Sequence, residues 1–287
     1  MECLKKVEIR SIMKISVNEH FCLLNPHRKG EGKLGYIQVI KNNIENEHIC
    51  CALGAKQYEQ AVNEKKRWLT ERMDEGLVFY RLNERAKVFI EYLPAEMAWV
   101  PIQAPNYMYI NCIWVSGRYK NKGYAKQLLD NCKEDAMARG MDGIVHIVGK
   151  KKYPYLSDKR FFEHMGFELV DEAEPYFQLV ALKWNDRSAV PSFKKKMKNS
   201  SVKEKGIAIY YTAQCPFAVG ILEELGKMAE NKGVIFKAHK LITKEEAQSA
   251  PTIWTTFGLF YDGEFITHEM MSSNKFEKLL TKLLEEE

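Results

Sequence analysis

The residues that could do chemistry gather in one run of the chain, residues 110–129, where a strand, a glycine-bearing turn and a helix follow one another. Residues 110–115 are apolar and predict the strand, and the helix is expected to begin near Gly123. The first backbone N–H groups of a helix lack intrahelical partners, and the helix dipole adds partial positive charge there. Such an end can cradle a pyrophosphate. An ordinary strand-to-helix turn with solvated lysines is the alternative.

Five residues of this turn would contribute in different ways. Gly123 would let the backbone approach the phosphates closely, and Ala125 keeps the next turn free of bulk. Lys120, Lys122 and Lys126 would attract an anion over a longer range.

The hydrophobic pattern predicts the elements that hold this run in place. Helices are expected at residues 55–75, 125–139 and 158–165, each closed by a glycine, and strands at residues 77–82, 86–92, 109–115, 144–148, 167–170 and 177–184. This order predicts a mixed α/β (α+β) sheet with a crossover in its second half, in one domain over residues 1–186.

Residues 187–205 interrupt the pattern and are interpreted as a linker. Their basic run, residues 194–196, leaves a phosphate-binding arm as the alternative. A second, smaller domain is expected over residues 206–287, with strands at 206–211, 234–241, 252–256 and 259–261 and helices at 217–231 and 274–284. Asp262-Gly263 predicts a hairpin turn.

Composition excludes several classes of protein. The chain has 287 residues and a net charge of +5 with acids and bases interspersed, so we expect no nucleic-acid partner. The seven cysteines are odd in number and form no CxxC pair, which argues against a disulfide scaffold and against a metal site. The charged start and the absence of a long apolar run predict a cytoplasmic protein without a membrane span. Nothing in the composition indicates an oligomeric state.

Residues 120–125 resemble the acetyl-CoA loop of the GNAT family of N-acetyltransferases. The preceding strand, the following helix, the strand at residues 143–148 and the closing helix with Gly166-Phe167 occur in the family's order, so the resemblance covers residues 7–184. It implies that acetyl-CoA is the donor substrate and that a primary amine of a small molecule or a peptide attacks the thioester directly. The cofactor-binding residues it implies are Trp114, Val115, Lys120, Asn121, Lys122, Gly123, Tyr124, Ala125 and Lys126.

The sequence departs from this family at the expected proton donor. A tyrosine often stands four residues before the closing glycine, but here that position is Phe162. Tyr153, Tyr155 and Ser157 lie just upstream and are candidate donors, with packing around a proline loop as the alternative for the two tyrosines.

The general base is less clearly indicated. His146 lies inside an apolar strand, and it could accept a proton near neutral pH if it faces the cleft. A buried histidine of the core is the alternative. Glu91 and Glu96 flank the neighbouring strand, and Cys112 could line the cleft or be an inert buried thiol.

The second domain places Cys215, followed by Pro216 and Phe217, between a strand and a helix start, where the helix dipole would lower the pKa of a thiol. This arrangement resembles the thioredoxin and glutaredoxin fold, with Pro251 at the position of its cis-proline. Ala218 stands where a second cysteine would be, which leaves a monothiol role or a binding module without redox turnover. A structural thiol is the alternative.

Most of the chain resembles the YoaP-like acetyltransferases, in which a GNAT domain precedes a domain of this kind. An N-acetyltransferase is the leading interpretation. The alternatives are a non-catalytic acyl-CoA sensor whose second domain docks a partner, or a monothiol redox protein.

Overall fold

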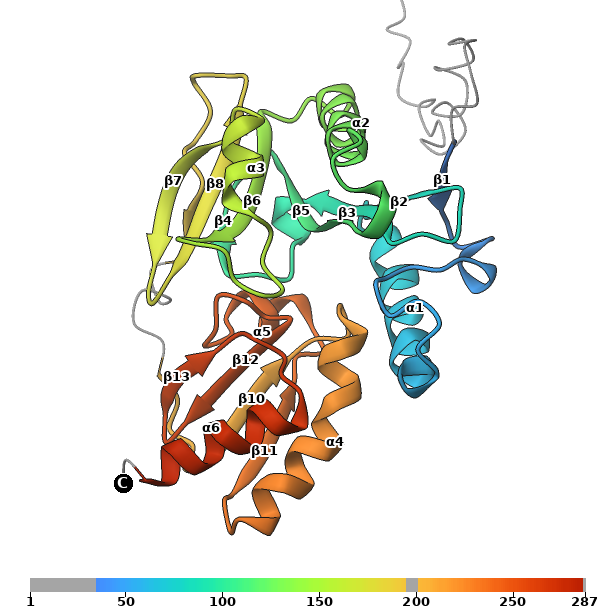
Figure 1. Cartoon of the computed structure of the whole chain (residues 1–287). Coiled ribbons are helices and arrows are strands. Elements are labelled where there is room, and N and C mark those ends of the chain that lie inside the picture. Colours follow the sequence, from blue (N-terminus) through green and yellow to red (C-terminus); the bar gives the residue numbers. More distant parts are fainter. Residues whose placement is uncertain (1–34, 195–200, 286–287) are drawn as a thin grey trace, which may run out of the picture. The chain divides into compact units, whose positions relative to one another are not determined.

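The computed structural model describes residues 35–194 and 201–285, which belong to one compact unit. They form a seven-stranded sheet, a four-stranded sheet and a small two-stranded sheet (Figure 1). None of the helices in these two ranges is long and apolar enough to cross a membrane.

The seven-stranded sheet carries the predicted phosphate-binding turn. In spatial order its strands are β1 (Tyr36–Val39), β2 (Val78–Leu82), β3 (Val88–Pro94), β5 (Tyr107–Val115), β6 (Gly143–Gly149), β8 (Phe177–Lys183) and β7 (Glu168–Ala173). Only β5 and β6 are parallel, and all other neighbours are antiparallel. The parallel pair is joined through α2 (Tyr124–Ala138), so the predicted mixed sheet with one crossover is confirmed.

Each face of this sheet has its own hydrophobic core. On one face α2 packs across β3, β5 and β6, and Leu128, Leu129 and Cys132 are fully buried there. The short helix α3 (Lys159–His164) adds Phe162 to the same core. The helix α1 (Glu59–Met73) belongs to the opposite core through Trp68 and others, preceded by the 3-10 helix η3 (Lys56–Tyr58).

The second domain is the four-stranded sheet with three helices. Its elements are β10 (Ile207–Tyr211), α4 (Pro216–Asn231), β11 (Phe236–Lys240), α5 (Lys244–Gln248), β12 (Phe257–Tyr261), β13 (Glu264–Thr267) and α6 (Ser273–Glu285). The spatial order is β11-β10-β12-β13, with β10 and β11 parallel and the other pairs antiparallel. The predicted hairpin between β12 and β13 is confirmed.

One predicted strand is wrong: residues 252–256 form an irregular segment that ends in a turn, and β12 begins only at Phe257. The hydroxyl of Thr255 donates instead to the carbonyl of Trp99 in the first domain. Thr252 lies against Gly258, where an added Cβ would be 2.6 Å from its Oγ1. Contacts across the domain boundary therefore replace a strand ladder here. The hydrophobic pattern of the sequence also did not predict the short helix α5.

Part of the segment interpreted as a linker is packed on the first domain. β9 (Ser192–Phe193) pairs with β4 (Ile102–Gln103), and Phe193 is 2% exposed. Lys194 of the basic run donates to Gln248 at 3.1 Å. The other two lysines of that run lie outside the described residues.

Candidate active site

The parallel strands β5 and β6 separate at a defined point. They pair over three residues, ending with Tyr109 opposite Val145. The next residue of β6, His146, points its ring into the widening gap, where Nδ1 lies 2.8 Å from the carbonyl oxygen of Ile110. Beyond Ile110 the edge of β5 that faces β6 has no described strand beside it, whereas β3 still pairs with the other edge, so the backbone groups on the open edge can serve a ligand.

The His146 ring is fully engaged by the protein. A carbonyl oxygen can only accept, so Nδ1 carries the hydrogen and Nε2 accepts from the hydroxyl of Ser157 at 2.9 Å. The ring also stacks on Phe162 with centroids 4.5 Å apart. Burial lowers the pKa of His146 to about 4, outweighing its hydrogen bond to Ile110. These contacts support the alternative in which His146 is a neutral residue of the core.

A buried ion pair lies beside the point where β5 leaves β6. The register between β3 and β5 shifts at Glu91, which leaves Asn111 as an extra residue in β5. Glu91 is completely buried and accepts from Asn111 at 3.0 Å and from Lys65 at 2.7 Å. Burial alone would lower the pKa of Lys65, but Glu91 reverses that effect and the net pKa is raised. The ammonium group of Lys65 therefore stays charged.

The sequence pattern did not single out Lys65, although a signal for it exists. Ala61, Lys65, Trp68 and Leu69 recur at helical spacing in α1, and all four are buried. A lysine on the apolar stripe of a helix needs an acidic partner, and Glu91 supplies it.

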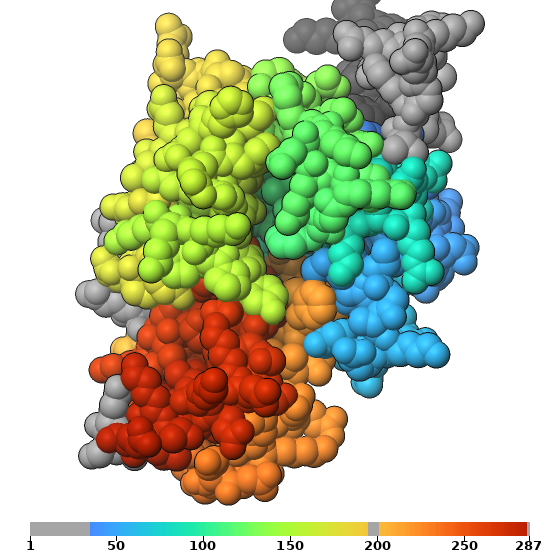
Figure 2. Space-filling view, in the orientation of Figure 1, coloured from blue at the N-terminus to red at the C-terminus, as the bar shows by residue number. Residues whose placement is uncertain are grey.

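The turn predicted to bind phosphate does lie at the start of a helix. Gly123 caps the N-terminus of α2 with a left-handed φ of 82°, and no side chain caps this end of the helix. An added Cβ at Gly123 would meet nothing within 4 Å. Lys120 and Lys122 are exposed, whereas Lys126 is paired with Asp130 at 2.6 Å. In Figure 2 the surface is hollowed between the green segment that contains α2 and the yellow-green segment that contains α3.

A cavity of about 520 Å³ lies on the face of β5 that is opposite to α2. The first domain lines it with Cys50, Cys51, Lys65, Lys87, Phe89, Asn111, Cys112, Trp114, Ser116, Pro154 and Tyr155. The second domain lines it with Gln214, Cys215, Pro216, Phe217, Trp254, Thr256, Glu269 and Met270. Most of these side chains are apolar or uncharged, and the acidic Glu269 is paired with Lys275 at 2.5 Å.

The cavity brings together some of the predicted site residues and leaves others out. Trp114, Tyr155 and Cys215 line it, but Tyr153 and His146 do not. Tyr153 stacks on Tyr176 with centroids 4.3 Å apart, which supports the packing alternative for this residue. Tyr155 is 41% exposed, and burial together with Cys215 raises its pKa to about 12.

Two expectations for the second domain need correction. Cys215 is the N-cap residue of α4, yet the pKa of its thiol is raised rather than lowered. Burial in the cavity outweighs the neighbouring Lys65 and the backbone N–H groups at the helix start. Pro251 also lacks the expected cis bond, since within the described residues the cis peptide is Glu174–Pro175.

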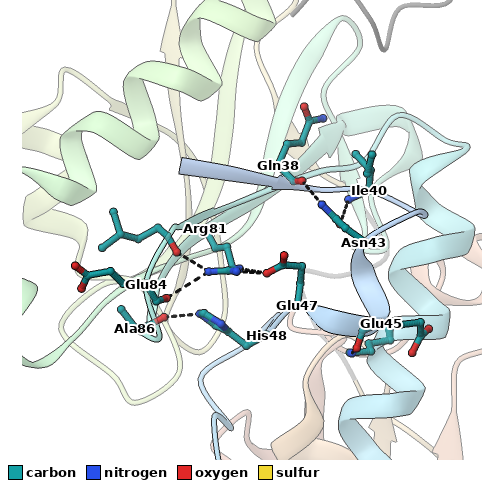
Figure 3. Close-up of polar contacts among 11 residues, drawn as sticks. Gln38, Ile40, Asn43, Glu45, Glu47, His48, Arg81, Glu84 and Ala86 are labelled. Carbon is teal, nitrogen blue, oxygen red and sulfur yellow. Dashed lines mark hydrogen bonds and ion pairs between the residues drawn. The ribbon is translucent and has the colours of Figure 1, made fainter. Parts of the chain in front are cut away.

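The loop that carries Cys50 and Cys51 is fixed to the first sheet by polar contacts (Figure 3). Arg81 forms an ion pair with Glu47, and its guanidinium also donates to the Leu82 carbonyl at 2.7 Å. His48 Nε2 lies 2.8 Å from the carbonyl of Ala86. These bonds hold the loop against the β2–β3 hairpin, so the two thiols have defined places in the cavity wall.

The second domain is attached to the first by hydrogen bonds and by a shared hydrophobic core. Gln248 donates to the carbonyls of Glu96 at 3.0 Å and Ala98 at 2.9 Å. His268 bridges the Tyr176 hydroxyl at 2.7 Å and the Pro154 carbonyl at 2.9 Å. The hydrophobic core on this face contains residues of both domains. The second domain is therefore a structural wall of the cavity.

Comparison with known proteins identifies the class to which this fold and site belong. A model of the acetyltransferase (GNAT) family matches residues 42–167, and a YoaP-like family model matches residues 236–278. The chain belongs to the GNAT acetyltransferases, with a YoaP-like C-terminal region. It is 69% identical over 248 residues to the uncharacterised N-acetyltransferase YoaP of Bacillus subtilis (strain 168), covering 86% of this chain and 99% of that protein.

The solved structures to which this chain is similar are more distant in sequence. An N-acetyltransferase from Staphylococcus aureus Mu50 is 12% identical, covers 53% of this chain and 99% of its own, and has a TM-score of 0.38. The GNAT family N-acetyltransferase YhbS from Escherichia coli, in complex with CoA, is 13% identical, covers 59% and 94%, and has a TM-score of 0.37.

Proposed function

We propose that this enzyme transfers the acetyl group of acetyl-CoA to the primary amine of a small, largely apolar acceptor that binds in the cavity. The observation that carries the proposal is the position of the cavity. Cys112 and Trp114 of β5 line it beyond the last β5–β6 pair, and Pro154 and Tyr155 line it from the segment that follows β6. The cavity thus borders the gap between the two strands.

The donor would lie on the other side of that gap. Its pyrophosphate would bind the uncapped N-terminus of α2 at Gly123, Tyr124 and Ala125, with Lys120 and Lys122 adding charge. Asn121 shares this turn with a φ of 59°, and Lys126 would act in it only by leaving Asp130. The free backbone edge at Trp114 and Val115 would receive the pantetheine arm and the thioester.

Transfer would follow from the placement of the two substrates. Holding the amine beside the thioester makes the attack effectively intramolecular. The bond between nitrogen and the acetyl carbon forms, and the bond between that carbon and sulfur breaks. The nitrogen gives up one proton to solvent, and the thiolate of CoA must gain one. Of the two tyrosine candidates only Tyr155 lines the cavity, so we assign it as the proton donor.

The lining also sets limits on the acceptor. Phe89, Trp114, Phe217, Trp254 and Met270 provide apolar walls. Lys65, the buried cation of the lining, is paired with Glu91 at 2.7 Å. A polycation would find little to balance its charge here, and a cavity of about 520 Å³ is the size of a small-molecule site.

The second domain is proposed to have a thioredoxin-like fold. Its strand order, with the first two strands parallel and the last two forming a hairpin, supports this assignment, as does the position of Cys215 at the start of α4. Two features depart from the redox site of that fold: the peptide bond before Pro251 is trans, and Ala218 stands where a second cysteine would be. Its role in acetyl transfer is to complete the acceptor cavity.

The test is a CoA-release assay on the full chain with small apolar amines, aminoglycosides, polyamines and peptides as acceptors. We expect release with the small apolar amines, and loss of it in Trp114→Ala because this side chain borders both substrates. Acetyl-CoA binding without release for any acceptor would instead favour the acyl-CoA sensor. Release with peptides alone would contradict the small-molecule assignment.

A further inference from the structure

Thiols are concentrated around the acceptor cavity. The described residues contain five free cysteines, and four of them line this cavity: Cys50, Cys51, Cys112 and Cys215. The fifth, Cys132, is buried in the core on the other face of the sheet. Acetyl transfer as proposed above uses none of the four, so their convergence from three separate segments is unexplained by that reaction.

The two segments that bring Cys51 and Cys215 to the cavity are packed against each other. The 3-10 helix η3 follows Cys51, and α4 begins directly after Cys215. Tyr58 of η3 contacts Phe217 of α4 edge-on, with ring centroids 4.9 Å apart. A Cβ on Gly220 of α4 would lie 2.3 Å from the Tyr58 ring, so the two backbones approach closely.

The position of Cys215 suggests that its partner thiol lies outside its own domain. A thiol at the start of a helix after a strand is the attacking position of thiol–disulfide exchange. The position three residues on, where a second thiol would lie, is the buried Ala218. The first domain supplies thiols at the same cavity instead.

We propose that Cys215 and Cys51 form a disulfide across the domain boundary when the protein meets a low-molecular-weight disulfide, and that this bond closes the acceptor cavity. The sulfur of Cys215 attacks one sulfur of the small disulfide and releases one small thiol, which takes the proton of Cys215. The sulfur of Cys51 then attacks Cys215 and releases the second small thiol with the proton of Cys51. The two cysteines lose two electrons in total, and the small disulfide gains them.

Two properties of the cavity shape this reaction. Cys51 is partly exposed whereas the adjacent Cys50 is buried, and the segment that follows Cys51 packs on the start of α4, which supports the choice of Cys51 over Cys50. Burial raises the pKa of both thiols, to about 12 for Cys51. Both thiols are therefore mostly protonated at neutral pH, and their exchange with a small disulfide is slow.

The experiment incubates the full chain with hydroxyethyl disulfide for hours, blocks free thiols, and maps peptides without reduction. We expect a cross-link between the peptide with Cys50 and Cys51 and the peptide with Cys215. Because the first two cysteines share a peptide, matched variants separate them. Cys50→Ser should keep the cross-link, and Cys51→Ser and Cys215→Ser should each lose it.

Several results would overturn the proposal: a link from Cys215 to Cys112, a link that persists in Cys51→Ser, or Cys215 carrying only a mixed disulfide. The cross-link does not depend on the proposed acetyl transfer, so it can be found even if no acceptor is. Where CoA release is measurable, oxidation should abolish it in the wild type, a dithiol should restore it, and Cys215→Ser should resist the loss.

Discussion

The Nδ1 atom of His146 donates a hydrogen bond to the carbonyl oxygen of Ile110 across 2.8 Å, at the first residues beyond the β5–β6 ladder. The His146 side chain thus makes the hydrogen bond that the next backbone pair of the ladder would otherwise make. The ring is held there by Phe162 on one side and by the hydroxyl of Ser157 at the other nitrogen. The gap in which we place the thioester is therefore held open by a packed imidazole.

The neutral His146 should make the fold sensitive to acid. Its pKa is about 4 in the folded protein and 6.5 in the unfolded chain, so between these values only the unfolded chain takes up the proton. Stability is then lost as the pH falls from 6.5 towards 4, by at most about 3 kcal/mol from this residue. His268 has a lowered pKa for the same reason, burial, and acts in the same direction.

Urea unfolding of wild type and His146→Gln at pH 7, 5.5 and 4.5 checks this prediction. The quantity compared is the change in unfolding free energy with pH, because the substitution itself alters stability. The variant should lose less stability on acidification. Equal losses in the two proteins would contradict the neutral assignment.

Gly123 can be tested against a matched glycine at the other end of the same helix. Gly123 and Gly140 both have left-handed φ values, 82° and 69°, and an added Cβ would meet nothing at either position. Gly123→Glu and Gly140→Glu should therefore lose similar stability. Only Gly123→Glu brings a negative charge to the proposed pyrophosphate site, so its Kd for acetyl-CoA should rise about tenfold or more, roughly 1.4 kcal/mol.

Calorimetric titration with acetyl-CoA measures this difference. An unchanged Kd in Gly123→Glu, or an equal loss in both variants, would remove the loop from the cofactor site.

The buried pair of Lys65 and Glu91 should behave unlike an exposed pair. Glu91→Gln leaves the ammonium group of Lys65 buried without a charged partner, which costs about 3–5 kcal/mol. The double variant Lys65→Met/Glu91→Gln should recover much of that loss, because no uncompensated charge remains and the new amide oxygen can still accept from Asn111.

Glu223→Gln is the control, since it breaks the exposed Lys227–Glu223 pair at 2.6 Å. It should leave the free energy of unfolding almost unchanged, because exposed ion pairs contribute little. Unfolding free energies from urea titrations compare all three. A double variant no more stable than Glu91→Gln would show that the cost lies in packing and not in charge.

Tyr155 and Tyr153 offer a paired test of the proton donor. Tyr155 lines the cavity and Tyr153 is stacked outside it. Loss of a general acid lowers kcat by roughly a hundredfold or more, so Tyr155→Phe should show that drop with little change in KM. Tyr153→Phe should keep the wild-type kcat. Steady-state kinetics with an acceptor identified by the CoA-release assay measure both kcat values. An unchanged kcat in Tyr155→Phe would mean that solvent protonates the thiolate.

Gly220 is predicted to be a contact glycine of the domain boundary. In an unobstructed helix, alanine would be more stable than glycine by about 1 kcal/mol. Here the added Cβ would lie 2.3 Å from the Tyr58 ring, and such overpacking costs about 1–3 kcal/mol. Gly220→Ala should therefore lower the Tm.

The same substitution in a Tyr58→Ala background should raise the Tm, because the obstacle is gone. This reversal of sign is the informative result. Destabilisation of equal size in both backgrounds would mean that the domains do not meet at this contact.

Much of the fold could be predicted from local patterns. The strand, turn and helix around Gly123 could be predicted because glycine favours a turn and because apolar residues recur with a helical period of 3.6. The hairpins and the order of elements followed for the same reason. Residues 252–256 failed as a strand because Thr255 bonds to Trp99, a contact with no local trace.

The sequence by itself therefore determined the class of enzyme and its predicted donor-binding turn, since both depend on neighbouring residues. Only the tertiary structure decided what surrounds the side chains that are far apart in the chain. It placed His146 in the core, joined Lys65 to Glu91, and collected Tyr155 and Cys215 in one cavity. Burial also reversed the expected pKa shift of Cys215, because desolvation depends on what covers a group, and distant segments provide that cover.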